Sequence, residues 1–175
     1  KHIMQKKYVA RLVVAAMCLA LCLVLPFLTG QIREIGSMLC PMHLPVLLCG
    51  FLCGWPWGLA VGAVAPLLRS ALFVMPPLFP IAVSMAAELA VYGLVTGLLS
   101  ARLPKKLGWT YVSLIAAMLL GRVAWGLVRL LLAGLSGGAF TWAMFLSGAL
   151  TTAIPGIIVQ LILVPVIVTA VQKRV

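Results

Sequence analysis

Long apolar runs separated by short polar or proline-rich breaks dominate the chain. We distinguish six such runs, at residues 8–28, 41–53, 57–74, 81–101, 109–132 and 142–171. Most are long enough for a helix to cross the roughly 30 Å hydrocarbon core of a bilayer. The first run is too long for the apolar core of a signal peptide, so we expect a retained membrane helix. The pattern predicts an all-α integral membrane protein with six transmembrane helices, in one domain over residues 1–175.

The second run, 41–53, is shorter than the others. As a helix it would measure only about 20 Å at 1.5 Å per residue. Pro41 and Pro45 lie at its start, where we expect irregular chain. Irregular backbone at membrane depth is tolerated only where it is buried in protein or lines a cavity. Residues 36–45 are therefore expected to border a site.

Basic residues lie at every second boundary between the runs. They are Lys6, Lys7 and Arg11 before the first run, Arg102, Lys105 and Lys106 after the fourth, and Lys173 and Arg174 after the sixth. With six crossings all three clusters fall on one side, which the positive-inside rule assigns to the cytoplasm. Both termini are therefore expected to be cytoplasmic.

Composition excludes several classes of function. Hydrophobic residues make up 65% of the chain and charged residues 9%, with a mean hydropathy of +1.24. A water-soluble enzyme of this size could not bury that much apolar surface. The net charge of +11 is not gathered on one polar face, so nucleic acid is not an expected partner. With no phosphate-binding glycine-rich loop, the chain is not expected to hydrolyse ATP itself.

The odd number of cysteines, all in or beside apolar runs, argues against a disulfide framework. They are Cys18, Cys22, Cys40, Cys49 and Cys53. Free cysteine is readily buried, so we interpret all five as small packing residues. A membrane-embedded thiol redox or lipid-modifying enzyme is the alternative from another functional class.

Four charged residues lie inside the apolar runs: Arg69, Glu88, Arg122 and Arg129. The predicted orientation places all four in the outer half of the bundle, below an outer loop that holds Arg33. A charge in the bilayer interior costs at least about 2.5–3.5 kcal/mol, so these groups need a polar cavity or mutual pairing. Only one carboxylate is available in these runs to pair with three guanidinium groups. The surplus of positive charge favours an anionic or strongly polar ligand that enters from outside.

Arg122, Trp125 and Arg129 share one helical face, and with Arg33, His43, Arg69, Glu88 and Trp142 they form the expected substrate-binding set. Structural roles are open for several of them. Arg69 and Arg129 would snorkel to the headgroups, Glu88 and Arg122 would form a structural pair, and Trp142 would anchor at the interface. His43 would be a hydrogen-bonding residue at a helix start, or with Met38, Cys40 and Met42 a haem or soft-metal ligand; packing is the alternative for that cluster.

Small residues recur at four-residue spacing and would let helices approach closely. They include Gly50, Gly54, Gly58 and Gly62, then Ala82, Ala86 and Ala90, and Gly93 with Gly97. In the first run, the stripe Ala16-Met-Cys-Leu-Ala20 has the same spacing.

This stripe, the six-helix size, the long outer loop and the stretch Leu44-Pro-Val-Leu-Leu-Cys-Gly-Phe-Leu-Cys-Gly-Trp-Pro-Trp-Gly-Leu-Ala-Val-Gly62 together resemble one family. The chain resembles the substrate-binding S-components of energy-coupling factor (ECF) vitamin transporters. The resemblance covers nearly the whole chain and implies a multi-pass protein of the prokaryotic plasma membrane that is not an enzyme.

The resemblance also implies roles. A small bundle would capture a micronutrient from outside under a loop at residues 29–40, then topple in the membrane. It would dock through Ala16 and Ala20 on a transmembrane coupling subunit that works with two cytoplasmic ATPase subunits. No cofactor is expected. We expect a small, water-soluble, anionic nutrient such as pantothenate, with haem or another tetrapyrrole as the alternative.

Overall fold

The computed structural model describes residues 2–28, 39–151 and 154–172. The described residues form helices and no strand, as the apolar runs predicted. The elements are α1 (His2–Leu28), α3 (His43–Cys53), α4 (Trp55–Phe73), the π-helical turn η1 (Leu78–Ala82), α5 (Val83–Arg102), α6 (Leu107–Ser136), α7 (Trp142–Leu146), the π-helical turn η2 (Ser147–Thr151) and α8 (Ile154–Gln172). Within these residues, five helical segments are long and apolar enough to cross a membrane, and α3 is shorter.

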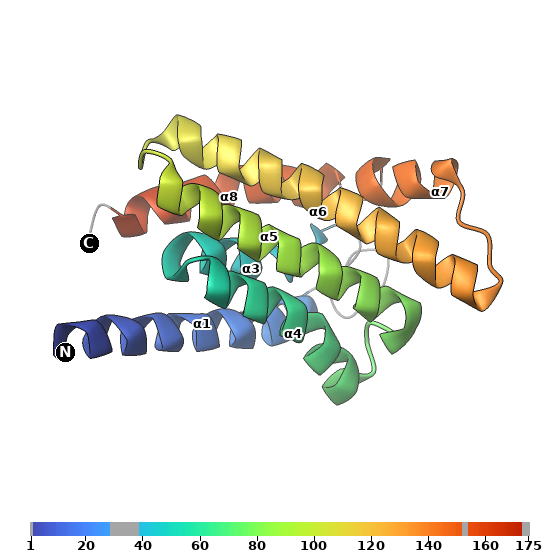
Figure 1. Cartoon of the computed structure of the whole chain (residues 1–175), viewed down its shortest axis with the longest axis horizontal. Coiled ribbons are helices and arrows are strands. Elements are labelled where there is room, and N and C mark those ends of the chain that lie inside the picture. Colours follow the sequence, from blue (N-terminus) through green and yellow to red (C-terminus); the bar gives the residue numbers. More distant parts are fainter. Residues whose placement is uncertain (1, 29–38, 152–153, 173–175) are drawn as a thin grey trace.

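The long helices run side by side along the bundle, and the chain reverses direction at each connection (Figure 1). The start of α1 and the end of α8 therefore lie at one end of the bundle, which we call the terminal end. The turns before α5 and between α6 and α7 lie at the opposite end, which we call the loop end (Figure 1). This arrangement is the one that six crossings require; the cytoplasmic location of the terminal end stays a prediction.

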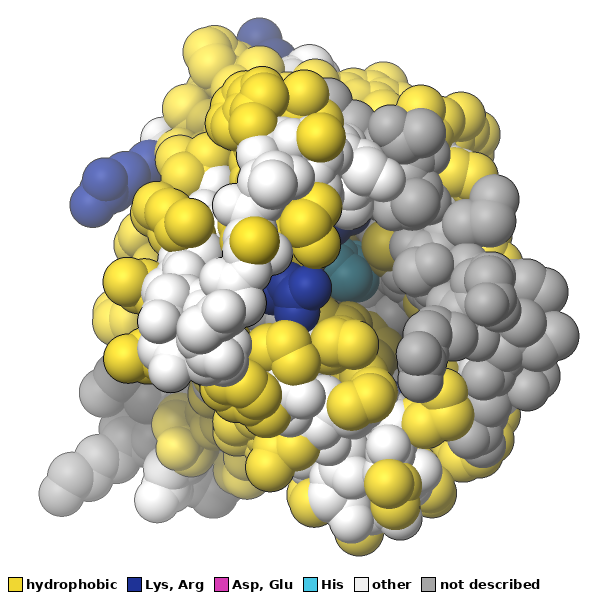
Figure 2. Space-filling model, turned by 90° about the vertical axis from the view of Figure 1, so that its right-hand side faces the viewer, with side chains coloured by type: hydrophobic (Ala, Val, Ile, Leu, Met, Phe, Trp, Pro, Cys, Tyr) yellow, Lys and Arg dark blue, Asp and Glu magenta, His cyan; other side chains and the backbone are white. Residues whose placement is uncertain are grey.

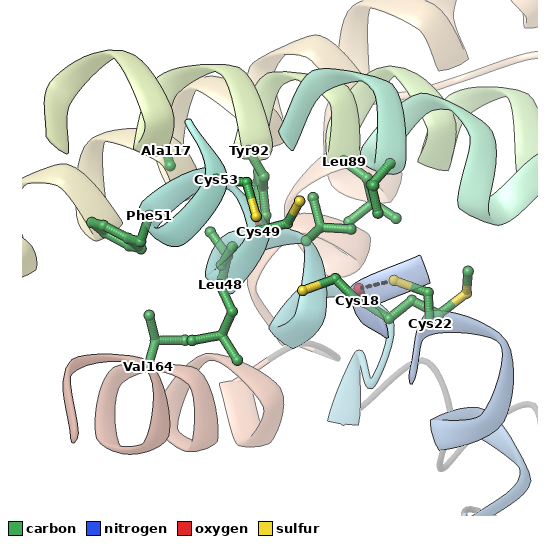
Figure 3. Packing of buried hydrophobic residues seen from close by; sticks show 14 of the residues in the cluster. Cys18, Cys22, Leu48, Cys49, Phe51, Cys53, Leu89, Tyr92, Ala117 and Val164 are labelled. Carbon is green, nitrogen blue, oxygen red and sulfur yellow. Dashed lines mark hydrogen bonds between the residues drawn. The ribbon is translucent and has the colours of Figure 1, made fainter. Parts of the chain in front are cut away.

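The short helix α3 lies in the interior, where it packs against α1, α4, α5 and α8. Most of its side chains are buried, including Val46, Leu47 and Cys49. Figure 3 shows this packing, with cysteine, leucine and aromatic side chains from several helices around α3. Because neighbouring helices shield α3 from lipid, its backbone does not have to match the thickness of the bilayer.

Glycine allows α4 and α5 to touch through their backbones. A β-carbon added at Gly58 would lie 2.5 Å from the carbonyl oxygen of Gly93. One at Gly62 would overlap the carbonyl of Leu89, and one at Gly97 would overlap the backbone of Trp55. The four-residue spacing of small residues thus produces the close helix contact that it predicted. This contact holds the stretch of α5 that carries the buried acid.

One boundary differs clearly from the apolar runs. Helix α6 continues through Gly134 to Ser136 and ends where Gly137 adopts a left-handed φ of 68°. The run 142–171, expected as one span, corresponds to the apolar helical segment Trp142–Gln172, in which α7 continues directly into the π-helical turn η2. The end of α6 depends on the backbone conformation of Gly137, which hydropathy does not report.

All five cysteines are buried thiols that form no disulfide. Cys18 of α1 lies toward Cys49 of α3 in the core, and the Cys22 thiol donates to the carbonyl oxygen of Met42 (Figure 3). Their environment is that of small apolar residues, which agrees with the interpretation as packing residues.

Candidate functional site

Three helices bring the central polar cluster together. His43 begins α3, Glu88 lies in α5, and Arg122 lies in α6. One close contact between α5 and α6 brings Glu88 and Arg122 together. Tyr92, one turn after Glu88, packs its ring against α6 at Gly121, where an added β-carbon would overlap that ring. Gly121 therefore lets α6 approach α5 closely, and the neighbouring Arg122 reaches Glu88.

Glu88 is the centre of the cluster. Its Oε1 lies 3.0 Å from Arg122 Nη1 and 3.4 Å from His43 Nε2. Glu88 is only 1% exposed, and His43 is also buried. A carboxylate at this depth needs compensating charge, which Arg122 supplies directly. The sequence prediction left pairing of Glu88 with Arg122 open as a structural alternative; the ion pair is present, together with His43.

Two further residues complete the surroundings of the cluster. The ring of Tyr92 meets the ring of His43 edge-on, with centroids 5.2 Å apart. Arg122 Nη2 donates to the sulfur of Cys40 at 3.9 Å. Tyr92 was not among the predicted site residues, and Cys40 was predicted to be a packing residue. The spacing of Glu88 and Tyr92, which puts them on one helical face, was the available signal for Tyr92.

Several buried polar atoms in and near the cluster have no hydrogen-bond partner among the described residues. They are Nδ1 and Nε2 of His43, Oε1 of Glu88, and the Nε atoms of Arg122 and Arg129; of these, Glu88 Oε1 lies within ion-pair distance of Arg122. Buried guanidinium donors are costly when unpaired. The site therefore has unused capacity for a hydrogen-bond acceptor, and a carboxylate is the group that matches a guanidinium in geometry and charge.

Aromatic side chains surround Arg129, two helical turns beyond Arg122. Its guanidinium carbon lies 5.9 Å from the ring centre of Trp125 and 5.8 Å from that of Phe140. Trp142 stacks on Phe145 at 5.2 Å between ring centres, and is itself 72% exposed. The side chains around Arg129 thus form an aromatic group that consists of Trp125, Phe140, Trp142 and Phe145.

The cluster lies within reach of the surface at the loop end. Figure 2 shows a recess in this end of the bundle, with histidine and Lys or Arg side chains at its floor and hydrophobic side chains around it. The polar floor and the apolar walls are the usual features of a small-molecule site.

The remaining predicted site residues lie elsewhere. Arg69 of α4 is buried against α1, where it donates to the carbonyl of Leu23 and not to the central cluster. Arg33 and most of the expected loop at residues 29–40 lie outside the described residues. Ala16 and Ala20 lie on the exposed face of α1.

The described residues contain no group of three or more His, Cys, Asp or Glu side chains placed to hold a metal ion. His43 Nε2 faces Glu88, so this nitrogen is directed into the protein and not toward the recess. The cluster is thus arranged as charge-paired hydrogen-bonding groups.

The comparisons with known proteins identify the family. The family of ECF transporter substrate-specific components matches residues 10–168, nearly the whole chain. Neither a curated protein nor a solved structure gives a significant match. The family match excludes the thiol redox and lipid-modifying enzyme alternatives, because its members bind transport substrates and are not enzymes. The chain is a multi-pass membrane protein that works with the ECF transporter module, and it belongs to the substrate-specific components of ECF transporters.

Proposed function

We propose that this substrate-specific component captures a small, water-soluble nutrient that bears a carboxylate, of which pantothenate is one example. The observation that carries the proposal is that Arg122 and Arg129, which lie on one face of α6, each have a buried Nε donor without a hydrogen-bond partner among the described residues. Glu88 already neutralises Arg122, and Arg129, on the same face of α6, has no ion-pair partner among the described residues. A ligand carboxylate would supply the missing acceptor and the missing negative charge.

The parts of the site would have different tasks. Glu88, itself in contact with His43, would hold the Arg122 guanidinium at the floor of the recess. Trp125 and Phe140, which flank Arg129, would pack against the apolar part of the ligand and exclude water. Trp142 would cover the outer side, since it is exposed and stacked on Phe145. Arg33 and Arg69 were also expected to contact substrate; Arg33 keeps that role in the proposal.

Docking is the second part of the proposal. Ala16 and Ala20 form a small-residue stripe on the exposed face of α1, where a partner helix can approach closely. The partner would be the transmembrane coupling subunit, with two cytoplasmic ATPase subunits supplying the energy. The proposed orientation puts the recess outside and the terminal end in the cytoplasm.

Native mass spectrometry of the purified full chain, followed by calorimetric titration, tests the ligand. We expect a co-purified carboxylate compound. With pantothenate as the first probe and its primary amide as the matched control, the carboxylate should bind more tightly. Arg122→Lys keeps the charge but loses the fork, so it should weaken binding. Arg122→Ala should weaken it by about 2–5 kcal/mol.

Arg102→Ala, at the terminal end of α5, is the control variant and should leave affinity unchanged. Equal binding of a co-purified carboxylate and its amide would contradict the proposal, as would full affinity in Arg122→Ala. A co-purified tetrapyrrole with a haem absorption band would favour the haem alternative instead.

A further inference from the structure

We propose that Arg69 is a positioning residue: it holds the loop end of α1 against α4 and thereby keeps the α3 start, with His43, in place. The role differs from the substrate contact expected from its sequence position. It rests on the proposed function only in that His43 belongs to the binding site.

Arg69 is enclosed by protein and does not extend to the bilayer surface. It is 2% exposed, although it belongs to a helix in the apolar part of the chain. Among the described residues no carboxylate lies within ion-pair distance of it. Buried cations in membrane proteins are stabilised by acidic side chains or by backbone carbonyl groups, and Arg69 Nη1 donates to the backbone carbonyl of Leu23 in α1.

The acceptor lies in a weakened part of α1. Pro26 has no amide hydrogen, so the carbonyl of Cys22, four residues earlier, lacks its usual helical donor. Leu23 is the next residue, and the guanidinium of Arg69 lies near the carboxyl end of the helix, where positive charge is favoured. Arg69 therefore strengthens α1 at the turn where proline interrupts its hydrogen bonding.

Two phenylalanines fix the guanidinium plane. Its central carbon lies 4.8 Å from the ring centre of Phe27 in α1 and 5.3 Å from that of Phe73 in α4. The two rings meet at 89° with centroids 5.0 Å apart. Arg69 and the two rings thus join the last turn of α1 to the last turn of α4 through both polar and cation–π contacts.

A second contact connects this turn of α1 to the binding site. The thiol of Cys22 donates to the carbonyl oxygen of Met42 at 3.6 Å (Figure 3). Met42 directly precedes His43, which faces Glu88. A displacement of the end of α1 would therefore also displace Met42 and its neighbour His43. Cys53 lies at the opposite end of α3 and should be affected less.

The native cysteines test this without any ligand. The purified full chain is treated with N-ethylmaleimide, and the labelling rate of each cysteine is read by peptide mass spectrometry. In Arg69→Met, Cys22 and Cys40 should react at least about tenfold faster than in the unmodified chain, because local opening exposes them. Cys53, near the terminal end of α3, should change by less than about twofold.

Arg69→Lys retains the positive charge but not the full set of guanidinium donors. Its cysteine labelling rates should therefore fall between those of the unmodified chain and those of Arg69→Met. Arg102→Met, at the terminal end of α5, is the control and should leave all rates unchanged. Acceleration of all cysteines alike would mean that Arg69 only stabilises the bundle, which overturns the proposal. Acceleration of Cys22 alone, or of none, would overturn it as well. Since no nutrient enters the experiment, its outcome is independent of whether the carboxylate proposal holds.

Discussion

The ion pair between Glu88 and Arg122 offers the most direct test of the energetics of the site. Arg122 Nη1 and Glu88 Oε1 are 3.0 Å apart. At an effective dielectric constant of about 20, two unit charges at this distance attract by about 5–6 kcal/mol. Much of that attraction offsets the cost of removing both groups from water, so the net contribution of the pair is far smaller. When one partner is removed, the other charge stays buried without compensation, and the cost of its removal from water lowers the stability of the fold.

We therefore predict that Arg122→Met lowers the free energy of unfolding by about 3 kcal/mol, the lower end of the range for breaking a buried pair. The lower end applies because His43, 3.4 Å from the same carboxylate oxygen, still faces Glu88. In the double variant with Glu88→Gln no buried charge is left uncompensated. Its stability should return to within about 1 kcal/mol of the unmodified chain.

Unfolding in mixed micelles by titration with sodium dodecyl sulfate, followed by tryptophan fluorescence, measures the four corners of this double-mutant cycle. Arg129→Met is the matched control, because Arg129 lies on the same helix and has no ion pair among the described residues. A double variant as unstable as Arg122→Met would refute the reasoning. The double variant should still fail to bind the carboxylate probe; intact binding would make Arg122 a structural partner of Glu88 only.

Two further predictions concern helix contacts. Gly93→Ala should destabilise the bundle by about 1–3 kcal/mol, because the added β-carbon would overlap the backbone of Gly58. Gly134→Ala, with nothing within 4 Å of the added atom, should leave thermal stability unchanged or slightly higher, and equal melting curves for the two variants would contradict the prediction. Ala20→Trp should abolish uptake in cells while nutrient binding in detergent persists. The control Leu119→Trp, at a 63% exposed position of α6, should preserve uptake, and unchanged uptake in Ala20→Trp would remove this face of α1 from docking.

Hydropathy was sufficient for the class of the protein and for the location of its helices. Whether a segment can span a membrane depends on its own composition and length. Membrane helices can therefore be predicted without knowing which other helices they pack against. The spacing of Gly58, Gly62, Gly93 and Gly97 predicted close helix contacts for the same reason, since a missing side chain is visible in the sequence. The helix end at Ser136 was not predictable from hydropathy, because it depends on the left-handed backbone conformation of Gly137.

The sequence by itself also determined that Arg69, Glu88, Arg122 and Arg129 would need partners, because a lone charge in an apolar run is costly wherever it points. Only the tertiary structure decided which partners they have. Glu88 meets both Arg122 and His43, whereas Arg69 meets a backbone carbonyl of α1. These residues come from different helices, and their pairing depends on how the helices are rotated and shifted along one another. That geometry results from the sum of many packing contacts, which no single stretch of the chain contains.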